Sequence, residues 1–141
     1  MDVVNILLTA DAVELAFRQQ QQEQQRLQKL NKQLRHGLLT LLPGKCQMLS
    51  PPEAAASILC FAIPGYEAAI VCRLLAEKFA ILLSSGTACS AESRQTSPVL
   101  AAMGIAPDLA RAALRVSFGY NSAVDDIQAL LTALPQILKE Y

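Results

Sequence analysis

The feature that most constrains the fold is a stripe of leucines in the first third of the sequence. The leucines follow one another at spacings of three, four, four and three residues: Leu27, Leu30, Leu34, Leu38 and Leu41. This spacing places all five on one face of an α-helix. Because Pro43 and Gly44 end the pattern, we expect residues 3 to about 42 to be helical and the leucine face to pack on a core.

The first half of this helical region differs from the second. Residues 18–26 read Arg-Gln-Gln-Gln-Gln-Glu-Gln-Gln-Arg and carry no apolar side chain for about two and a half turns, so this segment cannot lie on a core. A solvated helix is the prediction, in preference to a coiled coil or an aggregating glutamine tract. Val3 to Leu8 is, by contrast, unusually apolar, and we expect it to self-associate or to pair with a partner.

Shorter elements of mixed type follow the Pro-Gly break. Strands are expected at 46–49, 57–63, 79–83 and 113–118, and helices at 66–78, at 98–103, after Pro107 and from Ser122 onward. In the last strand Leu114, Val116 and Phe118 share one face, which leaves Arg115 on the other. Ser122 with Asp125 three residues later resembles a capping box.

This order of elements predicts an α+β fold, with a small, mostly antiparallel sheet and helices packed on one face. A chain of 141 residues is long enough for one such domain. We expect residues 1–141 to form that domain, with a helical region at 1–42 and an α+β core at 45–141. The core includes the one long loop, at 84–96.

Composition argues against several classes of function. Basic and acidic residues balance at 12 each, and no basic block is present, which disfavours direct binding to nucleic acid or to an anionic membrane. The longest uncharged runs are too short to span a bilayer. Asp2 stands where a signal peptide needs a positive charge, so a cytoplasmic location is expected. With one histidine, four cysteines and no Cys-x-x-Cys pair, no metal site is expected.

The candidate site is the loop that contains Cys89. Its residues are Ser84, Ser85, Gly86, Thr87, Ala88, Cys89 and Ser90. Small neighbours leave the Cys89 sulfur uncovered, whereas Cys60 and Cys72 lie in apolar patterns typical of inert, packed thiols. Composition alone is equally consistent with Cys89 as a small residue in a tight turn. A cysteine protease is disfavoured, since His36, the only histidine, lies in the helical region.

Three motifs together resemble the C-terminal small domain of cysteine desulfurases, which are class-V aminotransferase-like enzymes that use pyridoxal phosphate (PLP). They are Ser84-Ser85-Gly86-Thr87-Ala88-Cys89, Val99-Leu100-Ala101-Ala102-Met103-Gly104 and Leu114-Arg115-Val116-Ser117-Phe118-Gly119. Their order and spacing fit the family without gaps. The stretch from Arg26-Leu27 to Gly37-Leu38 and the acidic pair Asp125-Asp126 are also similar to the family's helices.

The resemblance implies roles for two residues. Cys89 matches the cysteine that takes sulfur from PLP-bound L-cysteine and becomes a persulfide, and Arg115 matches the arginine that binds the substrate's α-carboxylate. It also implies a dimeric enzyme that passes sulfur to an acceptor, such as an iron–sulfur scaffold. The family's Ser-His-Lys stretch, which binds PLP, is absent, because Gly37 follows His36. We therefore expect the chain to bind no cofactor alone and to need a large PLP-binding domain or chain.

Two alternatives remain open at this point. The chain could be a non-catalytic module that accepts a persulfide on Cys89 from another desulfurase. It could also be a decayed fragment that is kept for its fold or for dimer contacts. The three interpretations differ in the residues that they need. A desulfurase domain needs both Arg115 and Cys89, a persulfide acceptor needs only Cys89, and a decayed fragment needs neither.

Overall fold

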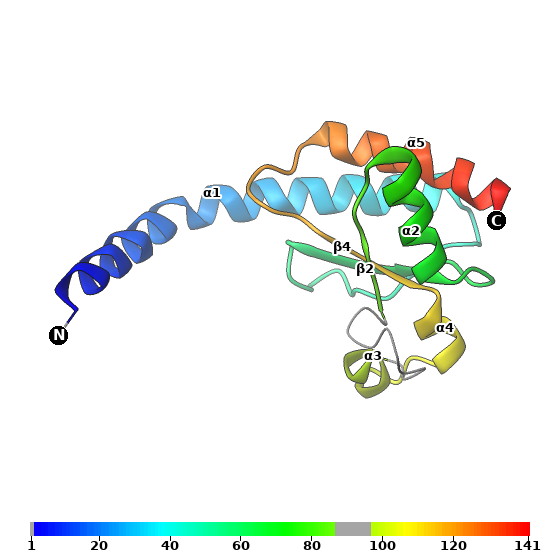
Figure 1. Cartoon of the computed structure of the whole chain (residues 1–141), viewed down its shortest axis with the longest axis horizontal. Coiled ribbons are helices and arrows are strands. Elements are labelled where there is room, and N and C mark those ends of the chain that lie inside the picture. Colours follow the sequence, from blue (N-terminus) through cyan, green and yellow to red (C-terminus); the bar gives the residue numbers. More distant parts are fainter. Residues whose placement is uncertain (1, 87–96) are drawn as a thin grey trace.

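The computed structural model describes residues 2–86 and 97–141 (Figure 1). The elements are α1 (Val3–Leu41), β1 (Gln47–Met48), β2 (Ile58–Ala62), α2 (Ala68–Phe79), β3 (Ser84–Ser85), α3 (Pro98–Ala102), α4 (Pro107–Arg111), β4 (Ala113–Ser117) and α5 (Val124–Glu140). The strands form one sheet in the order β1-β2-β4-β3, and each neighbouring pair is antiparallel. This architecture confirms the predicted α+β fold with a small antiparallel sheet.

The main core lies between the sheet and the three longer helices, α1, α2 and α5 (Figure 1). The leucine stripe of α1 supplies Leu30, Leu34 and Leu38, all of which are buried. The two central strands supply alternate residues, because successive side chains of a strand point to opposite faces. Leu59 and Phe61 come from β2 and Leu114 and Val116 from β4, and these four are also buried. The leucine face therefore packs on a core, as its spacing predicts.

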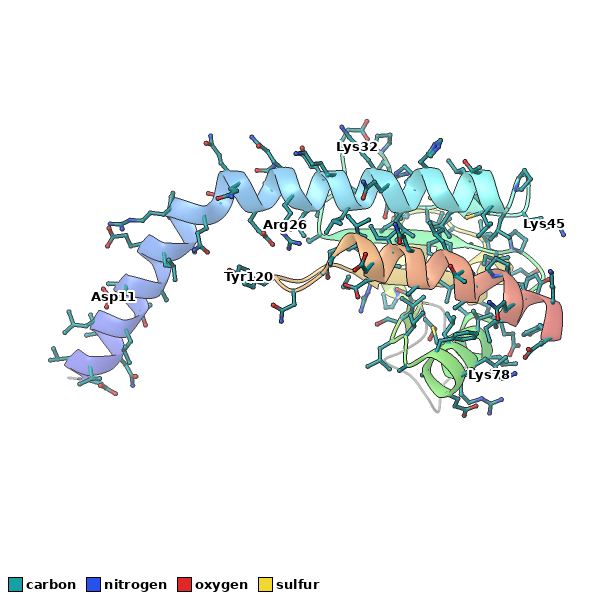
Figure 2. The ribbon with its side chains drawn as sticks, turned by 90° about the horizontal axis from the view of Figure 1, so that it is seen from above. Asp11, Arg26, Lys32, Lys45, Lys78 and Tyr120 are labelled. Atoms are coloured by element: carbon teal, nitrogen blue, oxygen red, sulfur yellow. The ribbon has the colours of Figure 1, made fainter. Side chains whose placement is uncertain are left out.

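Helix α1 is continuous, but only its second half touches the rest of the chain. Every described residue from 2 to 22 is exposed, and Figures 1 and 2 show this part projecting away from the sheet. Asp2 caps the helix, since its carboxylate accepts a hydrogen bond from the Asn5 N–H at 3.2 Å. The glutamine-rich segment is a solvated helix, as predicted. We call residues 3–22 the N-terminal arm.

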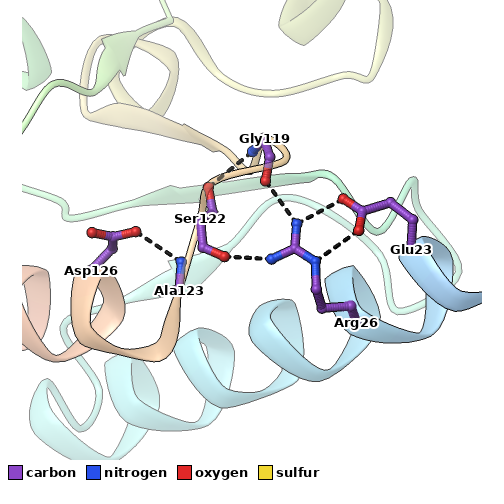
Figure 3. A network of polar contacts seen from close by, with 6 residues as sticks. All are labelled: Glu23, Arg26, Gly119, Ser122, Ala123 and Asp126. Atoms are coloured by element: carbon purple, nitrogen blue, oxygen red, sulfur yellow. Dashed lines mark hydrogen bonds and ion pairs between the residues drawn. The ribbon is translucent and has the colours of Figure 1, made fainter.

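A polar network fixes the arm's base to the turn between β4 and α5 (Figure 3). The Arg26 guanidinium forms two hydrogen bonds with the Glu23 carboxylate, each 2.7 Å long. It also donates to the carbonyl oxygen of Gly119 at 2.8 Å and to that of Ser122. These bonds join Arg26 to residues that lie 93 and 96 positions later in the sequence. They fix where α5 begins relative to α1.

Two local predictions are wrong. Residues 79–83 do not form a buried strand, because α2 extends to Phe79 and ends where Ala80 adopts a left-handed conformation. The next strand, β3, begins only at Ser84, and Leu82 is 84% exposed. Residues 80–83 form the connection that returns the chain from α2 to the sheet. Ser84 and Ser85 therefore belong to a strand and not to the long loop.

The start of α5 also differs from the prediction. The helix begins at Val124, and the Asp126 carboxylate accepts from the Ala123 N–H at 2.8 Å. The Ser122 hydroxyl instead accepts a hydrogen bond from the Gly119 N–H at 2.9 Å (Figure 3). Ser122 therefore closes the preceding turn, and the acid that caps the helix is Asp126, one residue later than expected.

Candidate functional site

The sheet face opposite the main core is only partly covered. Helices α3 and α4 cover one end of it, where Leu100 and Ala110 pack with Ala62 and Ala113 in a second, smaller cluster. Beyond this end, the outward residues of β4 are exposed, as the burial pattern of that strand shows. Arg115 belongs to this open face, which confirms the prediction that it projects away from Leu114 and Val116.

Strand pairing places Arg115 in the middle of a row of three side chains. Arg115 is opposite Cys60 of β2 on one side and opposite Ser84 of β3 on the other. Directly opposite residues of antiparallel strands project from the same face of a sheet, so the three share the open face. No acidic side chain within residues 2–86 and 97–141 forms an ion pair with Arg115. Among the described residues, its guanidinium is therefore not committed to a carboxylate.

The backbone brings Cys60 especially close to Arg115. The Cys60 N–H donates to the Ser50 hydroxyl at 2.8 Å, and its carbonyl accepts from the Leu49 and Ser50 N–H groups. Because both backbone groups of Cys60 point away from β4, Cys60 and Arg115 form a non-hydrogen-bonded pair. In such pairs the Cα atoms are about 4.5 Å apart, closer than in hydrogen-bonded pairs.

This proximity affects the Cys60 thiol. Partial burial raises the pKa of Cys60, and the positive charge of Arg115 opposes that rise. Sequence reasoning grouped Cys60 with the inert thiols and missed its place beside Arg115. The signal was present, since Leu59 and Phe61 mark the core face of β2 and so assign Cys60 to the opposite face.

Strand β3 leads from this row toward the cysteine loop. Ser84, Ser85 and Gly86 are described, whereas Thr87, Ala88, Cys89 and Ser90 lie outside the described residues. The Gly86 N–H donates to the Ala113 carbonyl at 2.8 Å, which holds the start of the loop against β4. A Cβ atom at Gly86 would lie 3.0 Å from a methyl of Leu100 and 3.1 Å from the Ala110 carbonyl oxygen. The glycine is thus required by close packing.

Replacing Gly86 by alanine is therefore expected to destabilise the fold by about 1–3 kcal/mol, the range for overpacking a tight site. Gly119→Ala is the matched control, because a Cβ at Gly119 would meet no atom within 4 Å. Urea denaturation of the two variants measures the difference. Equal midpoints for both would show that Gly86 is not tightly packed.

The other two described cysteines behave as packed thiols. Burial raises the pKa of Cys46 and of Cys72 from 9.0 to about 11, and Cys46, Cys60 and Cys72 are all free thiols. A raised pKa means that the folded state disfavours the thiolate, so ionisation of these thiols favours unfolding. Their contribution to the free energy of unfolding is therefore fully present below pH 9 and is lost as the pH rises toward 11.

We expect the free energy of unfolding to fall between pH 9 and pH 11 for this reason. A variant with both Cys46→Ala and Cys72→Ala should show a shallower fall across the same interval. Denaturant titrations at a series of pH values measure both curves. Parallel curves for the two proteins would refute ionisation of these thiols as the cause.

No lysine is placed on a strand of the open face. A PLP enzyme needs a lysine amine to bind the cofactor aldehyde. All five lysines are among the described residues, and none lies on a strand: Lys29, Lys32, Lys45, Lys78 and Lys139. Within the described residues no group of side chains could hold a metal ion, and no helix is long and apolar enough to cross a membrane.

Comparison with known proteins identifies the family. The model of the class-V aminotransferases matches residues 2–130. The chain belongs to this family. It is 33% identical to the IscS-like cysteine desulfurase of Mycobacterium tuberculosis over 95% of its own length and 34% of that protein. It is 32% identical to the cysteine desulfurase IscS of Acinetobacter baumannii over 86% of its length and 29% of that protein.

Solved structures agree on the fold. A NifS-like protein superposes with a TM-score of 0.77 over 94% of this chain and 32% of the other, at 23% identity. A cysteine desulfurase from Thermococcus onnurineus gives a TM-score of 0.62 over 83% of this chain and 26% of the other, at 22% identity. The chain spans about a third of the length of the curated relatives it matches. The predicted resemblance to cysteine desulfurases is confirmed.

Proposed function

We propose that residues 1–141 form the small domain of a cytoplasmic cysteine desulfurase, which becomes active when a large PLP-binding domain or chain completes it. The observation that carries the proposal is Arg115. Its guanidinium is exposed on the open sheet face, next to the strand that leads into the cysteine loop. Membership of the class-V aminotransferases supports the same assignment.

In this proposal Arg115 binds the α-carboxylate of L-cysteine. A guanidinium presents a planar fork of donors that fits a carboxylate with two parallel hydrogen bonds. The central position of β4 in the sheet fixes the backbone of Arg115 between two neighbouring strands, and so fixes the point from which the guanidinium reaches the substrate. Ser84 and Cys60, on either side, are small enough to leave the guanidinium accessible.

Cys89 accepts the substrate's sulfur and becomes a persulfide, a role that rests on the resemblance of the loop. It follows Gly86 by three residues, a span of at most about 11 Å along an extended chain. The Gly86 hydrogen bond to Ala113 therefore fixes the loop's start close to the Arg115 row. Such a short connection is what transfer between a substrate at Arg115 and a thiol at Cys89 requires.

The remaining components come from other molecules. None of the five lysines lies on a strand, so we assign PLP to the large domain and expect the chain alone to release no sulfide from L-cysteine. A sulfur-acceptor protein, such as an iron–sulfur scaffold, would receive the persulfide. A second candidate function is a non-catalytic persulfide acceptor, which would need Cys89 but not Arg115.

Capture of the tagged chain from its own cells tests the proposal. The expected product contains a second protein or domain with the visible absorbance of PLP and releases sulfide from L-cysteine. The Cys89→Ala variant should capture the same PLP protein without that activity. A colourless chain that carries extra sulfur on Cys89 would support the acceptor instead. A colourless chain with no extra sulfur would contradict both functions.

A further inference from the structure

The open sheet face holds a thiol that the proposed function does not use. Cys60 is a free cysteine and is partly exposed. It packs against the small cluster under α3 and α4, and the side chain of Arg115 beside it is exposed. Because the substrate of the proposed enzyme has to reach Arg115 even when a large domain is present, other molecules of that size can reach this position too.

Cys60 differs from the other described cysteines in having a cation next to it. Strand pairing sets it opposite Arg115, in a non-hydrogen-bonded pair whose Cα atoms are about 4.5 Å apart. The charge of Arg115 opposes the rise in the pKa of Cys60, whereas burial alone shifts the pKa of Cys46 and of Cys72. Within the described residues the guanidinium forms no ion pair. A thiol and an anion-binding fork therefore share one cross-strand pair.

We propose that Cys60 is a modification site for small disulfides that carry a carboxylate close to their sulfur. Arg115 binds the carboxylate, with the planar fork that fits such a group, and so holds the disulfide beside the Cys60 sulfur. L-cystine belongs to this class, because its carboxylate and its sulfur are joined through the α- and β-carbons alone. The modification needs only Cys60 and Arg115, and its effect on catalysis rests on the proposed function.

The reaction is a single thiol–disulfide exchange. The Cys60 thiolate attacks one sulfur of the bound disulfide, so that a new S–S bond forms at Cys60 as the original S–S bond breaks. The other half leaves as a thiolate and takes up the proton that Cys60 released. Cys60 is oxidised and the leaving half is reduced, so no further oxidant is required. Excess thiol reverses the modification by the same exchange.

Binding at Arg115 makes this exchange selective. Partial burial raises the pKa of Cys60, which keeps the thiolate scarce at neutral pH and makes unassisted exchange slow. A disulfide held beside the sulfur reacts at a much higher effective concentration. The half that stays on Cys60 keeps its carboxylate next to Arg115. In the proposed enzyme, this adduct would occupy the guanidinium and exclude the α-carboxylate of L-cysteine until a thiol removes it.

The test compares two disulfides that differ in charge alone. Dithiodipropionate carries carboxylates, and dithiodipropionamide carries neutral amides in their place. Each is incubated with the full chain bearing Cys89→Ala, so that an adduct on Cys60 comes directly from the reagent. Acid quenching and peptide mass spectrometry give the rate at Cys60. The same chain unfolded in urea gives the intrinsic difference between the reagents.

Relative to the unfolded chain, the carboxylate is expected to accelerate modification of Cys60 in the folded chain at least about tenfold, the effect of one charge-assisted hydrogen bond. Arg115→Ala should abolish this preference. Arg111→Ala is the matched control, since Arg111 pairs with Asp108 outside the sheet, and it should keep the preference. An equal effect of Arg115→Ala on both reagents reports thiol ionisation, so only the difference between them reports carboxylate binding.

An unmodified Cys60, the same preference in the folded and the unfolded chain, or a preference that survives Arg115→Ala would overturn the proposal. These measurements use neither PLP nor sulfide release. Their failure is therefore distinct from a failure of the desulfurase assignment, which is measured as sulfur on Cys89.

Discussion

Replacement of Arg115 by alanine is expected to lower kcat/KM for L-cysteine by roughly 100-fold in the proposed complex of this chain with a PLP-binding partner. Loss of one member of a hydrogen-bonded charge pair costs about 2–5 kcal/mol, and each 1.4 kcal/mol is a factor of ten. Steady-state kinetics of sulfide release measure the effect. Arg115→Lys should recover only part of the loss, because lysine keeps the charge but not the planar fork.

Arg111 provides the matched control for this prediction. It lies just before β4, its side chain is 54% exposed, and it pairs with Asp108 of the same short helix. Arg111→Ala removes the same charge from the same region but should leave kcat/KM nearly unchanged. If the two alanine variants were equally active, Arg115 would have no role in binding the substrate, and the persulfide-acceptor function would be favoured.

Replacement of Leu34 by alanine is expected to lower the free energy of unfolding by about 2–5 kcal/mol, the range for removal of a buried leucine side chain. Leu34 is fully buried and lies in the α1 stripe that packs on the sheet. A domain of this kind is stable by only about 5–15 kcal/mol, so the change is a large part of the total. Urea denaturation followed by far-ultraviolet circular dichroism measures it.

The control for the core prediction is Leu82→Ala. Leu82 is 84% exposed, in the turn between α2 and β3, so the same change in side-chain size should cost less than about 0.5 kcal/mol. A cost for Leu34→Ala that matched this small value would show that the second half of α1 does not contribute to the core.

The parts of the fold that sequence reasoning predicted correctly are those with a clear hydrophobic period. The leucine stripe of α1 and the alternation around Arg115 each repeat over several residues, so the buried face follows from geometry alone. The stretch from Phe79 to Leu83 is apolar but short, and periodicity cannot separate a buried strand from a helix end and a turn in such a stretch. The left-handed conformation of Ala80 ends the helix. Glycine is usual at such a position, so an alanine there gives no sequence signal that the helix ends.

The candidate site shows a similar division. The position of Arg115 follows from the alternation of β4, but its neighbours depend on which strands pair and in which register. That pairing joins Cys60 and Ser84 to Arg115 from segments far apart in the sequence. The sequence predicts Gly86 only as one of the small residues of the Cys89 loop, whereas its described role is close packing on Ala110 and Ala113. Such contacts arise only from the assembled fold.

The most direct test of the desulfurase assignment is to locate sulfur on the chain after one turnover. The complex with the PLP-binding partner would be incubated with L-cysteine, trapped by alkylation and analysed by peptide mass spectrometry. One reductant-labile extra sulfur on Cys89, with none on Cys60, and its loss in the Arg115→Ala variant, is the result that we predict. An unmodified Cys89 in a complex that releases sulfide would contradict the account.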